Sequence, residues 1–340
     1  MLINSKKSIL CISLFFCSLL FVGCSNLSDG RRIVRISHGQ SVTHPQHLGL
    51  MAFEEYIEKN LPDKYDIQIF PNELLGPSVK AIELVQTGAI DFVVSSTSNL
   101  ETFNDIYQIF SMPYLFDSVE AYRKVMEDEK ILEPIYTSTE SSGFESITWF
   151  DAGTRNFYAT TPIKTPEDLK GKKIRVIASP TNIKMMEAFG AAATPMSFGE
   201  VYTAIQQGVI QGAENNELAL TNNKHGEIAK YYTYNQHQMV PDMLVGNSKF
   251  LNSLSEEERK IFEEAAKICT QVEIEEWKKE IEVAKKEAAE EMGVEFIYPD
   301  VDAFKEKMLP LHEEILEANP KLKPIYDNIQ VVNKEVEEGN

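Results

Sequence analysis

Apolar residues along the chain follow two alternating spacings, which together predict an α/β fold. Short apolar runs bounded by turn residues, namely "RIVRISHG", "YDIQIFP" and "AIDFVVS", have the composition of buried strands. Between and after them, "HLGLMAFEEYIEKNLP" and "VKAIELVQTG" carry apolar residues at the spacing of amphipathic helices. Strands that alternate with helices are typical of sheets with parallel strands.

One short pattern occurs twice, 120 residues apart. The stretch "QTGAI" at 86–90 recurs as "QQGVI" at 206–210, each time after a helical segment and before an apolar run. In both places the glycine is expected to end the helix in the left-handed conformation, and a strand is expected to follow. A chain of 340 residues is also long enough for two domains with a core each. We therefore predict two α/β lobes of similar construction.

A long helix is predicted in the second half of the chain. Ser255 followed by Glu258 forms a capping-box signal, and Gly293 is the first helix-ending residue after it, because residues 255–292 contain neither proline nor glycine. At 1.5 Å per residue this segment would reach roughly 57 Å, more than one small domain. We expect it to run across both lobes, with its charged face in solvent.

The first residues have the pattern of an export signal. Lys6 and Lys7 precede an apolar run over 9–22, which is short for a membrane span. Gly23-Cys24 then makes the segment resemble a bacterial lipoprotein signal, although Phe21 stands where those signals favour leucine. We predict a signal peptide over 1–23, lipidation of Cys24 and a linker over 24–32, so that lipid alone would anchor the protein. Cleavage to a secreted protein is the alternative.

The charge and the missing motifs exclude several classes of function. The net charge is −19, and removal of the two signal lysines lowers it to −21, so nucleic-acid binding is not expected. Only Cys269 remains after Cys24, and we expect a core thiol and no disulfide. No catalytic or cofactor-binding motif is present. The histidines near 38–47 lack the further ligands of a metal site, so we predict neither enzyme activity, cofactor nor metal.

Two arginines suggest a site for a carboxylate. Arg175 stands inside the apolar run of "GKKIRVIASP", where a buried guanidinium needs a planar anionic partner, either an acid of the chain or a ligand. Arg155 lies in "DAGTRNFYAT", and Asn215 in "QGAENNELAL" follows a predicted strand, where open sheets bind ligands. Taken singly, they could equally be a salt-bridged arginine, a loop arginine and a turn asparagine.

The segment "GTRNFYATTPIKTPEDLKGKKIRVIASPTNIKMMEAFGAAATPMSFGEVYTAIQQGVIQGAENN" resembles the solute-binding proteins of tripartite ATP-independent periplasmic (TRAP) transporters. The likeness also covers "IFPNELLGP", "LVQTGAIDFV" and "FSMPYLFDS". It implies the two-lobed fold of periplasmic binding proteins, with a long helix bridging the lobes. Lobe I would comprise 33–152 plus about 241–280, and lobe II 153–240 plus about 281–335.

The resemblance also assigns roles to single residues. It implies that Arg175 forms the main salt bridge to the ligand carboxylate, that Arg155 and Asn215 support the same carboxylate, and that Phe198 lines the pocket. Arg175 is then expected to face water in the cleft when no ligand is bound. For lobe I we predict neutral hydrogen-bonding groups as ligand contacts: His38, Ser96, Asn99 and Gln238.

These groups favour a sugar acid, such as a uronate or aldonate, as the ligand. Members that bind sialic acid carry acidic residues at the positions of Ser78 and Ser96, and a C4-dicarboxylate would need a second cation. The resemblance implies delivery of the acid to membrane permease subunits driven by an ion gradient, from outside the cytoplasmic membrane or in the periplasm. A C4-dicarboxylate-binding protein, a capture protein that feeds a sensor, and an exported enzyme remain the alternatives.

Overall fold

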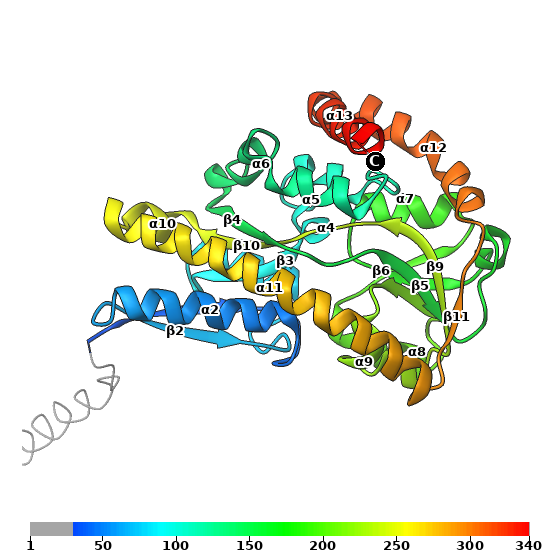
Figure 1. Cartoon of the computed structure of the whole chain (residues 1–340), viewed down its shortest axis with the longest axis horizontal. Helices are drawn as coiled ribbons and strands as arrows, with labels where there is room; N and C mark the ends of the chain where they lie inside the picture. Colours follow the sequence, from blue (N-terminus) through cyan, green and yellow to red (C-terminus); the bar gives the residue numbers. More distant parts are fainter. Residues whose placement is uncertain (1–29, 340) are drawn as a thin grey trace, which may run out of the picture.

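The computed structural model describes residues 30–339 and contains two β-sheets covered by helices (Figure 1). The predicted signal peptide and Cys24 lie outside the described residues. The first sheet defines the unit called lobe I here, and the second sheet defines lobe II. In sheet order, lobe I contains β2 (Tyr65–Phe70), β1 (Arg32–Ser37), β3 (Phe92–Ser96), β10 (Asp242–Asn247) and β4 (Phe144–Phe150). In sheet order, lobe II contains β11 (Glu295–Ile297), β9 (Tyr231–Gln238), β5 (Arg155–Ala159), β8 (Gly212–Asn215), β6 (Lys173–Val176) and β7 (Ala192–Pro195).

Both sheets are mixed. Strands β2, β1 and β3 are parallel, whereas β10 is antiparallel to both of its neighbours. In lobe II, β8, β6 and β7 are parallel and β5 is antiparallel to β8 and β9. The antiparallel strands β4, β5, β9 and β10 flank the two chain crossings between the lobes, at 151–154 and 239–241. These crossings place the strand ends of both sheets around one central region.

Helices cover both faces of each sheet. In lobe I, Phe53 and Phe262 pack on one face and Ile82 packs on the other. In lobe II, Leu220 and Met185 occupy the two opposite faces. The α-helices are α2 (Pro45–Asn60), α3 (Ser78–Thr87), α4 (Thr97–Leu100), α5 (Val119–Glu127), α6 (Glu129–Tyr136), α7 (Pro180–Ala188), α8 (Val201–Gln206), α9 (Leu218–Thr221), α10 (Ser248–Ser253), α11 (Glu256–Glu290), α12 (Val301–Ala318) and α13 (Lys323–Gly339). Short 3₁₀ helices are η2 (Asp105–Ser111), η3 (Glu140–Ser142), η4 (Pro166–Leu169), η5 (Phe198–Glu200), η6 (His225–Glu227) and η7 (Pro320–Leu322).

The long helix predicted over 255–292 is α11, which runs along both lobes in Figure 1. Its first turn has the capping box: Glu258 N donates to Ser255 Oγ at 3.2 Å, and Ser255 N donates to the Glu258 carboxylate at 2.8 Å. The repeated pattern is also confirmed, because Gly88 and Gly208 both end helices with positive φ, 74° and 70°. The predicted two-lobed α/β fold is therefore confirmed, including the helix that bridges the lobes.

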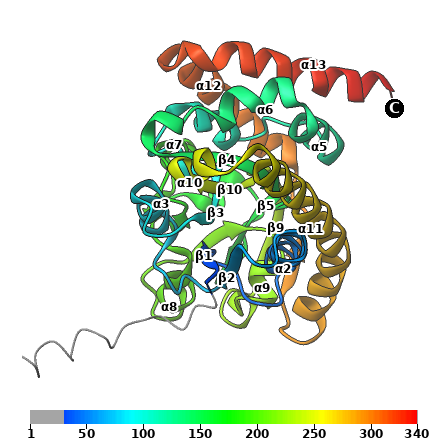
Figure 2. The ribbon, with the colours of Figure 1, turned by 90° about the vertical axis from the view of Figure 1, so that its left-hand side faces the viewer.

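The end of the chain returns from lobe II to lobe I. Helix α12 packs against α7, and α13 lies against α5 and α6, as Figure 2 shows. Asn333 Nδ2 in α13 donates to Leu115 O at 2.9 Å. Together with α11 and the two crossings, this contact ties the lobes together.

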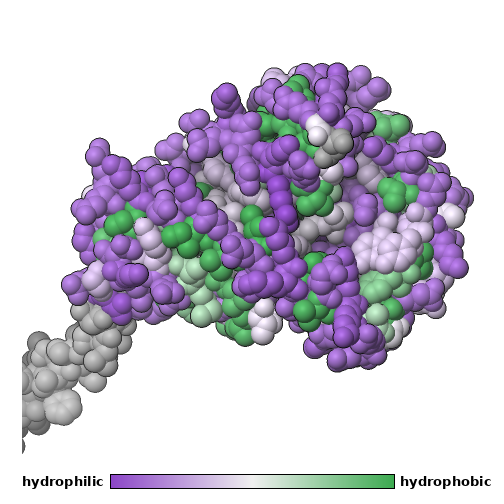
Figure 3. All heavy atoms as spheres, viewed as in Figure 1, coloured by the Kyte–Doolittle hydropathy of each residue, from purple (hydrophilic) through white to green (hydrophobic). Residues whose placement is uncertain are grey.

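The surface agrees with the acidic composition. Figure 3 shows a largely hydrophilic face around α11, interrupted by small hydrophobic areas. In the described part of the chain, no helix combines the length and apolar character needed to cross a membrane. Cys269 is a buried free thiol on α11, as predicted.

Candidate functional site

A cavity of about 410 Å³ lies between the two lobes. Strand ends and adjoining loops of both sheets supply its walls, as expected for open α/β sheets. Six of the eight predicted ligand contacts line it: Arg175, Arg155, Asn215, Phe198, Ser96 and Asn99. The volume is in the range of small-molecule binding sites.

Arg175 is one of two buried arginines that line this cavity. It is 4% exposed, and its Nε and Nη2 donate to Met196 O at 3.1 and 3.0 Å. The Phe198 ring lies 5.5 Å from the guanidinium carbon. Within residues 30–339, no carboxylate lies within 4.0 Å of this guanidinium. Arg175 therefore lines the cavity with Nη1 and part of Nη2 unused, and it is buried rather than facing open water as we had expected.

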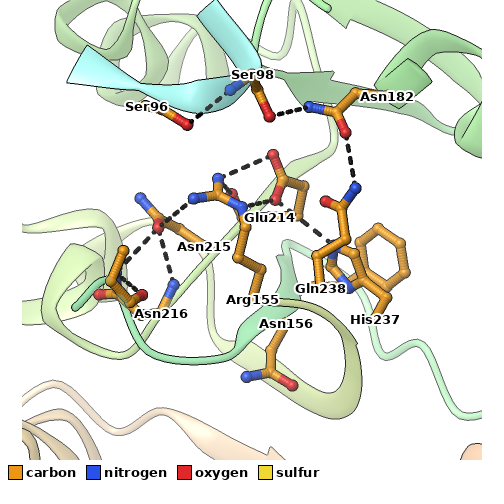
Figure 4. Close-up of polar contacts among 12 residues, drawn as sticks. Ser96, Ser98, Arg155, Asn156, Asn182, Glu214, Asn215, Asn216, His237 and Gln238 are labelled. Atoms are coloured by element: carbon orange, nitrogen blue, oxygen red, sulfur yellow. Dashed lines mark hydrogen bonds and ion pairs between the residues drawn. The ribbon is translucent and has the colours of Figure 1, made fainter. Parts of the chain in front are cut away.

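Arg155, in contrast, has an acid partner within the chain. Its Nε and Nη2 donate to the two Glu214 carboxylate oxygens at 2.5 and 3.0 Å, and Nη2 also donates to Glu214 O at 2.9 Å (Figure 4). Nη1 donates to Asn215 Oδ1 at 3.1 Å. The antiparallel pairing of β5 with β8 places the two residues together. One N–H of Nη1 remains for a ligand, so Arg155 offers much less than Arg175.

The pKa values of this pair reflect their burial and mutual attraction. Burial alone would raise the pKa of Glu214, but attraction and hydrogen bonding from Arg155 and His237 hold it at about 2. Burial lowers the pKa of Arg155, but Glu214 reverses that effect and the net shift is upward. Burial also lowers the pKa of Arg175, against attraction from Glu214. Because Glu214 already compensates Arg155, the formal charge of Arg175 is the one left without an ion-pair partner at this wall.

Asn215 is oriented by its neighbours. Its Oδ1 accepts hydrogen bonds from Arg155, from Asn216 N at 2.9 Å and from Asn216 Nδ2 at 3.2 Å. With Oδ1 fully used, the amide group presents Nδ2, which has no protein acceptor in the described part of the chain. Nδ2 is thus suited to donate to an anionic group beside Arg175.

Lobe I contributes polar groups to the cavity. Ser96 Oγ accepts from Ser98 N at 3.3 Å and caps α4, and Asn99 Nδ2 donates to Ser95 Oγ at 3.2 Å. These contacts leave the Ser96 hydroxyl hydrogen and the side-chain oxygen of Asn99, Oδ1, for other partners.

His38 and Gln238 do not line the cavity, contrary to the prediction. His38 is 1% exposed. Its Nε2 forms a hydrogen bond with His47 Nδ1 at 3.0 Å, and its Nδ1 accepts a hydrogen bond from Gln40 N at 3.2 Å. Gln238 is 2% exposed and donates to Ser111 O and, at 2.9 Å, to Asn182 Oδ1. Both ring nitrogens of His38 and the amide nitrogen of Gln238 are thus bonded inside the protein, whereas Gln238 Oε1 is buried without a hydrogen-bond partner in the described chain. Because neither side chain lines the cavity, we leave both out of the proposed site.

The sequence interpretation missed several residues of the cavity. The missed polar and aromatic lining residues include Glu73, His44, Gln46, Asp151, Glu200, Asp242 and Trp277. Gln46 Nε2 donates to Asp242 Oδ2 at 2.7 Å. Asp151 is paired with Arg123 at 2.6 Å. Burial lowers the pKa of His44 to about 3, so its imidazole is neutral at pH 7.

The acids missed in this way lie far apart in the sequence and come together only in the folded chain. The one available signal was that Glu73 falls within "IFPNELLGP", one of the stretches that carry the resemblance. In residues 30–339, no three His, Cys, Asp or Glu side chains are grouped to hold a metal ion.

Comparison with known proteins identifies the family. The model of the DctP family, described as "Bacterial extracellular solute-binding protein, family 7", matches residues 36–319. This chain belongs to that family. Solute-binding proteins of TRAP transporters capture small organic acids and deliver them to the membrane permease subunits of the transporter, which is the role predicted from the resemblance.

Individual relatives can be aligned with this chain over nearly its full length. "Uncharacterized protein YiiZ" of Salmonella typhimurium is 39% identical over 307 residues, which is 90% of this chain and 93% of that protein. A TRAP periplasmic solute-binding protein of Anaerococcus prevotii is 55% identical, with a TM-score of 0.89 and coverage of 90% of this chain and 99% of that one. Its structure contains bound α/β-D-glucuronate.

A more distant solved structure of the same kind comes from Sulfitobacter sp. NAS-14.1. This TRAP solute-binding protein is 32% identical, with a TM-score of 0.84 and coverage of 87% of this chain and 98% of that one. It was solved with bound β-D-galacturonate. The family 7 fold of the present chain is therefore that of solute-binding proteins solved with sugar acids.

Proposed function

We propose that this family 7 protein binds a sugar acid with one carboxylate, such as a uronate or aldonate, without chemical turnover, and delivers it to a TRAP permease. Arg175 binds the carboxylate, and Asn215 Nδ2 and the remaining N–H of Arg155 complete its contacts. Phe198 packs beside this carboxylate site. The observation that carries the proposal is the buried Arg175 guanidinium, which has unused donors toward the cavity and no anionic partner within 4.0 Å in the described chain.

The charges around the cavity favour one carboxylate over two. Arg155 is compensated by Glu214, which leaves the charge of Arg175 for a ligand. The lobe I wall adds the acids Glu73 and Asp242, together with neutral Ser96 and Asn99. A second ligand carboxylate would approach those acids, whereas ligand hydroxyls can donate to them. The glucuronate and galacturonate in the two solved relatives support the same choice.

A thermal-shift screen of residues 25–340 tests this function. Glucuronate, galacturonate and an aldonate are expected to raise the melting temperature by a few degrees at 100 times the dissociation constant, since binding then adds about 2.7 kcal/mol. Succinate and malate are expected to give smaller shifts, and glucose none. Equal stabilisation by glucose would contradict the carboxylate role of Arg175, and stabilisation by dicarboxylates alone would contradict a sugar-acid ligand. NMR of the bound acid after long incubation should show unchanged acid.

We also propose that lipid on Cys24 holds the protein at the outer face of the cytoplasmic membrane or in the periplasm. The proposal is supported by the sequence of the export signal and by the extracellular family. Cys24→Ser is expected to move the protein from the membrane fraction to the soluble fraction, with unchanged affinity for sugar acids. The cargo site lies far along the chain from residue 24, so loss of affinity would indicate a different role for this cysteine. Equal membrane association of both forms would contradict the lipid anchor.

A further inference from the structure

The loop after β2 places one acidic side chain, that of Glu73, in the wall of the cavity. Asn72 and Glu73 both have left-handed backbone conformations, with φ of 54° and 56°. Residues other than glycine adopt this conformation at a cost, so the surrounding structure must hold it. Here Asn72 N donates to Gln40 O at 3.0 Å and Glu73 N donates to His38 O at 3.1 Å. The loop is thus fixed on lobe I by backbone hydrogen bonds.

The two oxygens of the Glu73 carboxylate have different environments. Oε2 accepts a hydrogen bond from Gly199 N of lobe II at 3.3 Å, so this side chain connects the two lobes. Oε1 is buried and, within residues 30–339, has no hydrogen-bond partner. A buried carboxylate oxygen without a donor is costly. The side chain also lines the cavity, so a donor on a ligand can reach this region.

The segment that Glu73 contacts is also the segment that Arg175 contacts. Arg175 donates to Met196 O, and Glu73 accepts from Gly199 N three residues later. Phe198, whose ring lies beside Arg175, stands between these two contact points in the sequence. Burial raises the pKa of Glu73, while the Gly199 N–H and the nearby Arg175 oppose that shift. One short segment of lobe II is therefore held by a cation from its own lobe and by an acid from the other lobe.

We propose that Glu73 is a specificity-determining residue: its Oε1 accepts a hydrogen bond from a hydroxyl of the bound sugar acid, while Oε2 keeps the contact with Gly199. The inference rests on the proposed function, since it needs a ligand that carries both a carboxylate for Arg175 and a hydroxyl for Glu73. Recognition of the hydroxyl and closure of the lobes are then coupled through one side chain. A dicarboxylate would instead place a second anion against Glu73.

Glu73→Gln separates recognition of the ligand from the contact between the lobes. The amide oxygen of glutamine can still accept from Gly199 N, but the second oxygen becomes an NH₂ group that only donates. By calorimetry, glucuronate affinity is expected to fall at least tenfold, as a lost hydrogen bond to a charged acceptor requires. Affinity for succinate is expected to stay the same or rise, so the ratio of glucuronate affinity to succinate affinity falls.

Glu83→Gln on α3 is the matched control, because Glu83 is an exposed acid paired with Lys80 and does not line the cavity. It should bind glucuronate within twofold of wild type.

Gly199→Ala provides a second route if Glu73→Gln fails to fold. A Cβ atom at residue 199 would lie 2.8 Å from Glu73 Oε2 and displace the carboxylate. Gly199→Ala is expected to weaken glucuronate binding in the wild-type background. In a Glu73→Ala background it should have little further effect, because the obstructing oxygen is absent. Additive losses in the double variant would show that Gly199 acts independently of Glu73 and would count against the coupling.

The outcomes distinguish this inference from the proposed function. If wild type binds glucuronate and Glu73→Gln binds it equally well, Glu73 only links the lobes and the inference is wrong, although the function stands. A purely linking role also predicts that Glu73→Ala weakens all ligands by the same factor. If wild type binds no sugar acid, the proposed function itself fails.

Discussion

Arg175→Ala is expected to weaken binding of uronates by about 30-fold to a few thousand-fold, which corresponds to about 2–5 kcal/mol. The substitution leaves the ligand carboxylate buried without a cation, in a cavity whose lobe I wall carries Glu73 and Asp242. Calorimetric titration with glucuronate measures the effect. Arg175→Lys should recover only part of the affinity, because an ammonium group cannot form the paired, planar hydrogen bonds of a guanidinium.

The same substitution is expected to have a different effect on folding. Arg175 has no acid within 4.0 Å among residues 30–339, so its removal takes away a buried, uncompensated charge. The stability of the ligand-free protein to urea should then fall by no more than about 1 kcal/mol, because removal of that burial cost offsets the loss of the hydrogen bonds to Met196 O. Arg35→Ala is the charge-matched control, since Arg35 lies on β1 and does not line the cavity. Unchanged glucuronate affinity in Arg175→Ala would remove this residue from the site.

Local sequence signals were sufficient for the architecture. The long helix could be predicted because its boundaries depend on residues near in sequence: the Ser255 capping box and Gly293. The same holds for the helix ends at Gly88 and Gly208, where the left-handed glycine is a local requirement. The two lobes were predicted from the repeated pattern and the chain length, and the family resemblance implied the same arrangement.

The partners of polar side chains were not predictable in the same way. Arg155 and Glu214 meet because β5 and β8 pair in one particular register, and no local pattern specifies that register. The sequence therefore left open which arginine has an internal acid, and the structure places that acid on Arg155 instead of Arg175. Gln238 has the residue type of a ligand contact, but Ser111 and Asn182 take its amide hydrogens.

Glu73 shows the opposite error, since a functional candidate was overlooked. Asparagine adopts the left-handed conformation more readily than most residues, but glutamate seldom does, so nothing in "PNELLG" predicts that residues 72 and 73 both do. That backbone geometry is what directs the carboxylate toward Gly199 and the cavity. Its role depends on a contact between two lobes, which is beyond the reach of periodicity and motif spacing.

Glu214→Gln is expected to destabilise the fold by about 3–5 kcal/mol at pH 7, the usual cost of removing one partner of a buried ion pair. Both members are almost inaccessible to solvent, 5% for Arg155 and 0% for Glu214, so water cannot compensate the remaining guanidinium. Urea unfolding followed by tryptophan fluorescence measures the loss. Glu263→Gln removes the acid of an exposed pair with Arg259 and should change the stability by less than about 1 kcal/mol.

Acid titration of stability gives an independent test of the same pair. The pKa of Glu214 is about 2 in the folded protein, below its ordinary value of 4.5, so its contribution is complete above pH 4.5. That contribution, about 3 kcal/mol, should be lost progressively as the pH falls from 4.5 toward 2, because the unfolded chain takes up the proton first. Glu214→Gln should lack this part of the acid-induced loss, so the stability gap between wild type and variant closes over that pH range. A gap that stays constant from pH 7 to pH 3 would show that the ionised Glu214–Arg155 pair does not stabilise the fold.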